Sequence, residues 1–132
     1  MVTVEAAEGA VRIWIDSQMR IRTLEERIAI DADPLVYRII RRVTDKLPLM
    51  TAKGPIELPP EATRLLEYSE GEAPHIFFVD ENPRANWEHA CSYVFVGADK
   101  SITAVQSTVP PSAKTKTSLI PVSYRRPADL AR

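Results

Sequence analysis

The residues best suited to chemistry lie close together, between two apolar runs of the sequence. Residues 80–93, with the sequence DENPRANWEHACSY, carry acids, amides, an indole, an imidazole and the only cysteine of the chain. His89 and Cys91 are two positions apart, so on an extended strand both side chains project from the same face, roughly 6–7 Å apart along the backbone. A neighbouring imidazole lowers the pKa of a thiol and makes it a better nucleophile. Cys91 and His89 are therefore candidate catalytic residues of a small hydrolase.

A metal site would use the same residues. His75, His89 and Cys91 offer the nitrogen and sulfur ligands that zinc prefers, and a carboxylate or a water molecule could complete the set. Such a site requires the strand that carries His75 to lie near His89. The pattern has low specificity, because a single cysteine that enters a strand is usually a small buried hydrophobic residue. We therefore favour a structural thiol at Cys91, and the sequence predicts no cofactor.

A third kind of site would be basic. Arg38, Arg41, Arg42 and Lys46 recur at helical spacing and would form one stripe of a helix, from which they could contact phosphates. No aromatic residues are interleaved with them to stack on bases. The net charge of −1 and the pI near 6.1 also argue against a protein dedicated to nucleic acid or to acidic membranes. A regulator that binds nucleic acid through Arg38–Lys46 is therefore the lowest-ranked of three functions.

The elements that must position these residues begin with two patterns near the N-terminus. Val11, Ile13 and Ile15 alternate with other residues, which predicts strands within residues 2–16. A capping-box sequence at Thr23 and apolar residues on one helical face then predict a helix from about Leu24.

The next segment has the features of a helix. Asp33 and Pro34 are typical of a helix start, since Asp caps free amide groups and Pro suits the first helical position. Apolar residues follow at helical spacing up to Pro48, so the sequence predicts an amphipathic helix over residues 34–47. We expect its apolar face to pack against the sheet, through Val36, Ile39, Ile40 and Val43 on the helix and Phe77, Val94 and Val96 on the strands.

The remaining segments complete an α+β fold. Residues 48–60 hold four prolines and one glycine, which is typical of a connecting loop, and residues 60–68 predict a short helix. The runs at 75–79, 91–96 and 102–108 have strand length, and the turn composition of residues 97–101 predicts that the last two form an antiparallel hairpin. We therefore expect a small antiparallel sheet packed by two or three helices.

The C-terminal part of the chain differs in composition. Residues 110–132 contain four of the eleven prolines and carry a net charge of +4, against −5 for residues 1–109. The sequence thus predicts an α+β core domain over residues 1–109 and an extended, basic, Pro-rich arm over residues 110–132. The residues of the arm expected to bind a partner are Leu119, Ile120, Val122, Tyr124, Arg125 and Arg126.

These observations rank three functions. The first is a non-catalytic protein-interaction or assembly module, whose arm docks on a partner protein or on a neighbouring copy in a homo-oligomer. The Cys/His hydrolase or metal site is the second and the nucleic-acid regulator the third. No apolar run approaches the ~20 residues of a membrane span, and the N-terminus carries acids where a signal peptide has basic residues. The expected compartment is the cytoplasm, unless a cleaved signal or a longer parent chain is missing.

Overall fold

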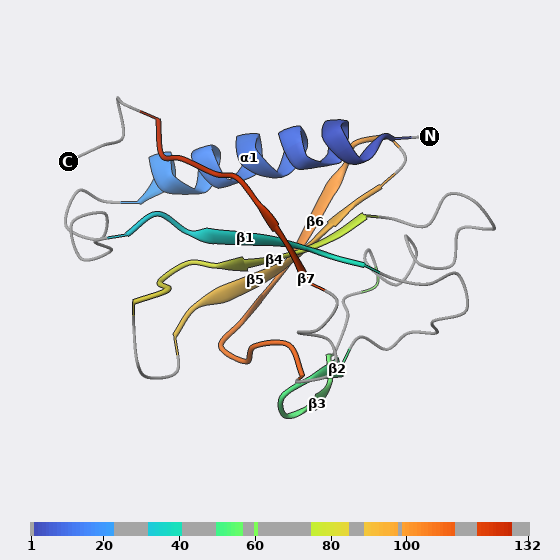
Figure 1. Cartoon of the computed structure of the whole chain (residues 1–132), viewed down its shortest axis with the longest axis vertical. Helices are drawn as coiled ribbons and strands as arrows, with labels where there is room; N and C mark the ends of the chain where they lie inside the picture. Colours follow the sequence, from blue (N-terminus) through green and yellow to red (C-terminus); the bar gives the residue numbers. More distant parts are fainter. Residues whose placement is uncertain are drawn as a thin grey trace.

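The computed structural model describes residues 2–22, 32–40, 50–56, 60, 75–84, 89–97, 99–112 and 119–127. The elements follow the order α1 (Val4–Ile21), β1 (Leu35–Ile39), β2 (Met50–Thr51), β3 (Gly54–Pro55), β4 (His75–Asp80), β5 (Cys91–Val96), β6 (Ile102–Ser107) and β7 (Leu119–Val122). Five strands form one antiparallel sheet in the order β6-β5-β4-β1-β7, while β2 and β3 form a separate small pair. Figure 1 shows α1 lying along the sheet. The α+β class and the antiparallel sheet are as expected, with one helix of full length among the described residues.

The N-terminal segment is a helix, so the prediction of strands within residues 2–16 is wrong. Thr3 caps α1, since its side-chain oxygen accepts a hydrogen bond from the amide of Ala6 at 3.1 Å. The buried residues recur every fourth position along one stripe of the helix: Ala7, Val11, Ile15 and Met19. Ile13, which the alternating pattern assigned to the core with Val11 and Ile15, points outward and is 68% exposed. The period of four therefore determines which face is buried, and the shorter alternation is incidental.

The predicted helix over residues 34–47 is wrong where the structure describes it, because residues 35–39 form β1. Val36 and Ile39 pair with β4, opposite Val79 and Ile76, so the two residues lie on opposite faces of the sheet. Ile40, expected on the same buried face, is 43% exposed. The remainder of that predicted helix, including Val43, lies outside the described residues, as do the helix predicted from Leu24 and residues 61–68 of the short helix.

The three strands predicted in the second half of the chain are confirmed as β4, β5 and β6. The β5–β6 connection is the expected hairpin turn, in which the Gly97 amide donates to the Ser101 carbonyl at 2.9 Å and Lys100 adopts a positive φ of 66°. All six residues of β5 are buried. On the face toward α1, Val94 and Val96 join the helix stripe; on the other face, Tyr93 and Phe95 join a second cluster. Both faces of β5 are therefore buried, although β5 is next to the edge strand β6 and not at the middle of the sheet.

The two edges of the sheet differ in chemistry. At one edge, β7 carries Pro121, which has no amide hydrogen to offer a further strand. At the other edge, β6 pairs with β5 along its whole length and contains neither proline nor a charged residue. Within the described part of the chain, no helix has the length and apolar character that spanning a membrane requires.

Candidate functional site

The acid and the imidazole of the predicted chemical cluster do meet. Asp80 is the last residue of β4, and its Oδ1 lies 2.7 Å from Nε2 of His89, in the connection that leads into β5. The same carboxylate oxygen accepts a hydrogen bond from the amide of Asn82 at 3.2 Å. Both side chains of the pair are mostly shielded from solvent, at 20% exposure for Asp80 and 23% for His89. Asp80 therefore orients the imidazole and closes the turn after β4.

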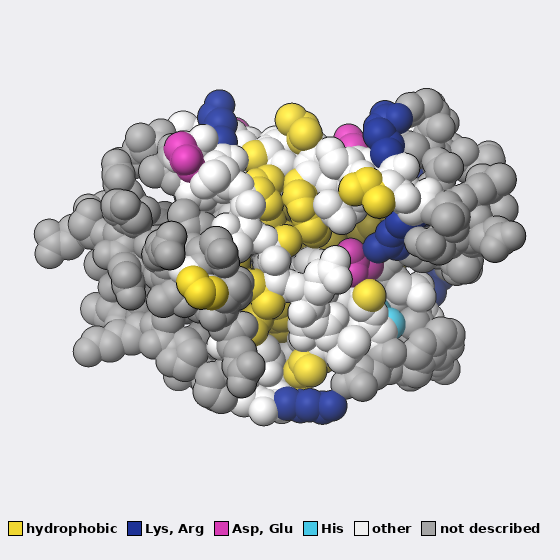
Figure 2. Space-filling model, turned by 180° about the vertical axis from the view of Figure 1, so that it is seen from behind, with side chains coloured by type: hydrophobic (Ala, Val, Ile, Leu, Met, Phe, Trp, Pro, Cys, Tyr) yellow, Lys and Arg dark blue, Asp and Glu magenta, His cyan; other side chains and the backbone are white. Residues whose placement is uncertain are grey.

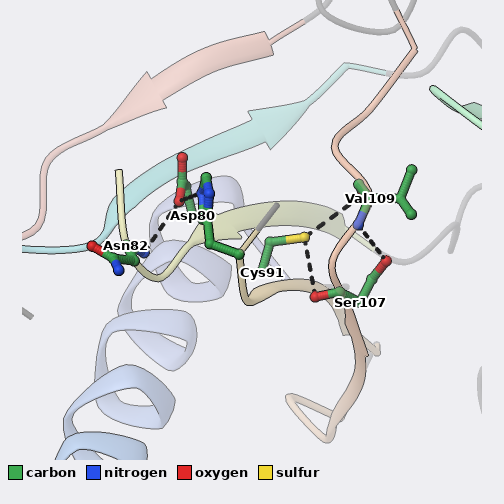
Figure 3. A network of polar contacts seen from close by, with 6 residues as sticks. Asp80, Asn82, Cys91, Ser107 and Val109 are labelled. Carbon is green, nitrogen blue, oxygen red and sulfur yellow. Dashed lines mark hydrogen bonds and ion pairs between the residues drawn. The ribbon is translucent and has the colours of Figure 1, made fainter. Parts of the chain in front are cut away.

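The thiol of Cys91 points away from this pair. Figure 3 shows its sulfur directed toward the segment after β6, where the carbonyl oxygens of Ser107 and Val109 lie 3.4 and 3.6 Å away. The pKa of the thiol is raised to about 11, mainly by burial and in part by the nearby carboxylates of Asp80 and Glu81, since each of these disfavours the thiolate. A nucleophilic cysteine needs the opposite environment. The arrangement therefore supports a structural thiol, which ties β5 to the chain after β6.

The three candidate metal ligands are not brought together. His75 begins β4 and its Nε2 lies 2.8 Å from the carbonyl oxygen of Val2, whereas His89 contacts Asp80 at the other end of the same strand. Five residue steps of a strand separate these ends by about 17 Å. Cys91 is near His89 in sequence but donates to backbone carbonyls. Among the described residues, no group of three histidine, cysteine or acidic side chains could hold a metal ion.

A buried ion pair that the sequence pattern did not reveal lies beside this cluster. Glu81 follows β4 and is 8% exposed, and its Oε1 accepts a hydrogen bond from Nη2 of Arg22 at 3.2 Å. Burial raises the pKa of this carboxyl, against the opposing influence of the Arg22 guanidinium. The contact joins the end of α1 to the end of β4. Its function is therefore to fix the helix on the sheet, and only the three-dimensional fold brings its two residues together.

Arg38, the one residue of the predicted basic stripe that the structure describes, does not lie on a helix. Arg38 lies in β1 on the face toward α1, opposite Phe77 of β4 and Ile120 of β7. Arg41, Arg42 and Lys46 lie outside the described residues. A stripe that requires i, i+3, i+4 and i+8 positions of one helix cannot include a residue of β1.

Most of the residues predicted to bind a partner through the C-terminal arm contact their own chain. Leu119 and Val122 pack into the two apolar clusters on opposite faces of the sheet. Tyr124 donates its hydroxyl to Oδ1 of Asp16 in α1 at 2.7 Å, and Arg126 forms an ion pair with Asp33 at 3.4 Å. Figure 1 shows this segment crossing in front of the sheet and continuing alongside α1.

Two of the six predicted arm residues, Ile120 and Arg125, have exposed side chains. Whether they contact a partner, and whether residues 110–132 form a separate domain, stay predictions. What the geometry shows is narrower: β7 pairs with β1 as a terminal strand of the sheet, and the residues after it contact one side of α1.

A different surface, at the opposite edge, was not identified from the sequence. We call it the β6 edge surface: strand β6, with Ile102 and Ala104, together with Ala6, Ala10 and Trp14 of α1, all of which are partly buried against the cluster between the helix and the sheet. On the other side of the helix, Arg12 donates to the carbonyl of Ser123 at 2.8 Å and Asp16 accepts from Tyr124. The helix therefore presents polar residues toward the segment after β7 and apolar residues on its other side.

Figure 2 shows the side of the molecule opposite β7 in space-filling form. Because β7 crosses in front of the sheet in Figure 1, the reversed view of Figure 2 looks onto the side of β6. Hydrophobic side chains gather through the centre of this view, with acidic and basic side chains around them. A spacing of four residues at Ala6, Ala10 and Trp14 was the sequence signal for this stripe. Comparison of the chain with protein-family models, with curated proteins and with solved structures gave no match.

Proposed function

We propose that this protein is a non-catalytic interaction or assembly module, whose sheet accepts a strand from a protein partner at the β6 edge surface. The observation that carries the proposal is the open edge itself. Among the described residues, β6 hydrogen-bonds only to β5, over six residue pairs, and its other side is left without a strand.

An exposed strand edge is normally protected. Soluble proteins place charged side chains, prolines or bulges on edge strands, because unpaired backbone groups otherwise recruit further strands. β6 reads Ile-Thr-Ala-Val-Gln-Ser and has none of these charges or prolines, whereas β7 has Pro121. An edge that lacks protection, next to an apolar helix side, has the features of a strand-addition site, where backbone hydrogen bonds give affinity and side-chain contacts give specificity.

In this proposal the C-terminal arm has a defined part. Its residues 119–122 form β7 and cover the edge of β1, and Pro121 takes one amide donor from β7, which favours strand addition at β6, while exposed Ile120 and Arg125 remain available for additional contacts. The partner is a protein. The expected compartment stays the cytoplasm, a prediction of the sequence alone. No observation favours the Cys/His hydrolase, the metal site or the nucleic-acid regulator over this function.

The proposal is tested with a pair of surface substitutions. Gln106 is exposed on β6, so Gln106→Lys leaves the core intact but places a charge on the edge, in the manner of natural protected edges. Thr108 is exposed just beyond the strand, and Thr108→Lys is the matched control with the same change in net charge.

The three proteins, wild type and the two variants, are immobilised and exposed to an extract of the cells in which the protein occurs. Bound proteins are then identified by mass spectrometry. We expect at least one protein, this chain or another, to be retained by wild type and by Thr108→Lys and lost with Gln106→Lys. The same set of proteins on all three would refute strand addition at β6.

A further inference from the structure

We propose that a surface around Arg38 binds a protein segment that carries one acidic side chain among apolar ones. We call it the Arg38 surface, and its residues are Arg38, Ile40 and Ile120. It belongs to β1 and β7, at the other end of the strand order from β6, so the proposal does not depend on strand addition at β6. It gives the proposed interaction module a second contact site.

Strand pairing brings the three side chains of this surface to one face of the sheet. Arg38 lies opposite Phe77 of β4 and Ile120 of β7. Phe77 packs in the cluster with α1, so Arg38 and Ile120 also point to the helix side of the sheet. Ile40 comes two positions after Arg38 and continues the same face just beyond the end of β1. Figure 1 shows β7 beside β1, with α1 above both strands.

Two large apolar side chains of the Arg38 surface are in contact with water. Ile40 is 43% exposed and Ile120 is 36% exposed. Val36 and Val122, a facing pair two positions further along β1 and β7, are only 3% and 7% exposed. The cover on the helix side of these two strands is therefore complete at one end and partial at the other. Exposed apolar side chains that lie together are typical of a surface that contacts another protein.

The charge at the centre of the Arg38 surface has no counter-charge in the part of the chain that the structure describes. Arg38 is half-buried, and no described residue accepts a hydrogen bond from its buried Nε. The carboxylate of Glu8 in α1 lies 3.7 Å from Nη2 of Arg12 instead. A charge that is partly removed from water gains more from an opposite charge than a fully exposed one does. Arg38 therefore favours a partner that supplies an anion.

The chemistry of this anion follows from the side chains around it. A guanidinium donates two parallel hydrogen bonds to the two oxygens of a carboxylate, and apolar neighbours keep water from such a pair. An arginine within an apolar surface is typical of the few residues that carry most of the binding energy at an interface. Nucleic acid draws on several basic side chains for its phosphates, whereas Arg38 is the only basic residue of β1 and β7. The fitting partner segment therefore has an aspartate or glutamate next to aliphatic or aromatic residues.

The test selects peptides and then locates where they bind. A phage-displayed library of random heptapeptides is selected on the immobilised full chain, and the binders are assayed on Arg38→Gln and on Arg125→Gln. Arg125 is exposed after β7, so its substitution is a matched control with the same change in net charge. We expect peptides that bind wild type and Arg125→Gln but not Arg38→Gln. Each should contain an aspartate or glutamate next to an apolar residue.

Affinities of a selected peptide are then measured by fluorescence anisotropy. Arg38→Gln should raise the dissociation constant by about tenfold or more, and so should replacement of the peptide's acid by its amide, which needs no change in the protein. The two changes together should raise it no further, since they remove the same contact. Ile120→Ala should weaken binding by a smaller factor. Thermal unfolding followed by circular dichroism confirms that each variant is folded.

The outcomes separate this inference from strand addition at β6. Peptides that depend on Arg38 should bind Gln106→Lys as tightly as wild type. Binders that are all lost with Gln106→Lys and all kept with Arg38→Gln overturn the inference and leave strand addition standing. Arg38-dependent peptides that contain no acid also overturn it, as does a single-stranded oligonucleotide that binds through Arg38 where no such peptide does. A library that yields no binder overturns it as well, while strand addition is judged by the capture experiment on Gln106→Lys.

Discussion

Two neighbouring isoleucines provide a direct test of the fold at β1. On a helix, Ile39 and Ile40 would both lie on the buried face, whereas on a strand they point to opposite sides. Here Ile39 is 5% exposed, in the cluster with Phe78 and Tyr93, and Ile40 is 43% exposed. Truncation of each residue to alanine should therefore have very different consequences.

The expected magnitudes follow from burial. Ile39→Ala removes buried methyl and methylene groups and leaves a cavity, at a cost of about 2–5 kcal/mol in the free energy of unfolding. Ile40→Ala removes groups that are already nearly half in water, and we expect a cost below about 1 kcal/mol. For a domain of this size, 1 kcal/mol corresponds to roughly 3–5 °C in melting temperature. Ile39→Ala should melt on the order of 10 °C below wild type, with Ile40→Ala within a few degrees.

The assay is thermal unfolding followed by circular dichroism, with urea unfolding as an independent measure of the same free energies. A similar, large loss of stability in both variants would mean that both side chains are buried on one face. That result would refute the assignment of residues 35–39 to a strand.

Two further predictions concern titratable groups near the end of β4. The pKa of Cys91 is raised from 9.0 to about 11, mainly by burial, so its thiolate fraction at neutral pH is about 100-fold lower than that of an ordinary thiol. Native protein should therefore react with a thiol reagent far more slowly than free cysteine does. An equal rate would contradict a buried thiol that is hydrogen-bonded to backbone carbonyl oxygens. Burial also raises the pKa of Glu81 above 4.5, so the native state binds the proton more tightly than the unfolded state. The free energy of unfolding should lose this contribution as the pH rises from 4.5 through the raised pKa, and Glu81→Gln should flatten this part of the pH dependence in urea titrations. An unchanged slope would exclude Glu81 as its source.

The sequence predicted the second half of the sheet well, because its information there is local. The apolar runs of β4 and β5 are too short for helices, and a Gly97-containing turn separates β5 from β6. A hairpin needs nothing beyond these neighbouring residues. The polar cluster between β4 and β5 was also placed correctly, although its bonds, Asp80 to His89 and Cys91 to carbonyl oxygens, could not be assigned without the backbone.

The first half was predicted with helix and strand exchanged. In residues 2–16 the pattern Val11, Ile13, Ile15 concealed the repeat of four, which Thr3 as a cap would have supported. In residues 35–39 the start signals at Asp33 and Pro34 outweighed the β-branched and aromatic composition of the strand. The decisive interactions there are pairings with β4 and β7, which lie far along the chain, and tertiary pairing overrides local preference.

The position of β1 between β4 and β7 has a consequence for the order in which the chain folds. Strands β4, β5 and β6 are joined by short connections and can associate as soon as they have been synthesised. β1 emerges long before either of its neighbours, so it must wait for β4, and it remains at the boundary of the sheet until β7 arrives. β7 is thus made after the other four strands of this sheet, and the contacts of residues 123–126 with α1 and with Asp33 join segments that lie far apart in the sequence. A chain stopped before residue 119 would leave two unprotected strand edges, β1 and β6, in place of one.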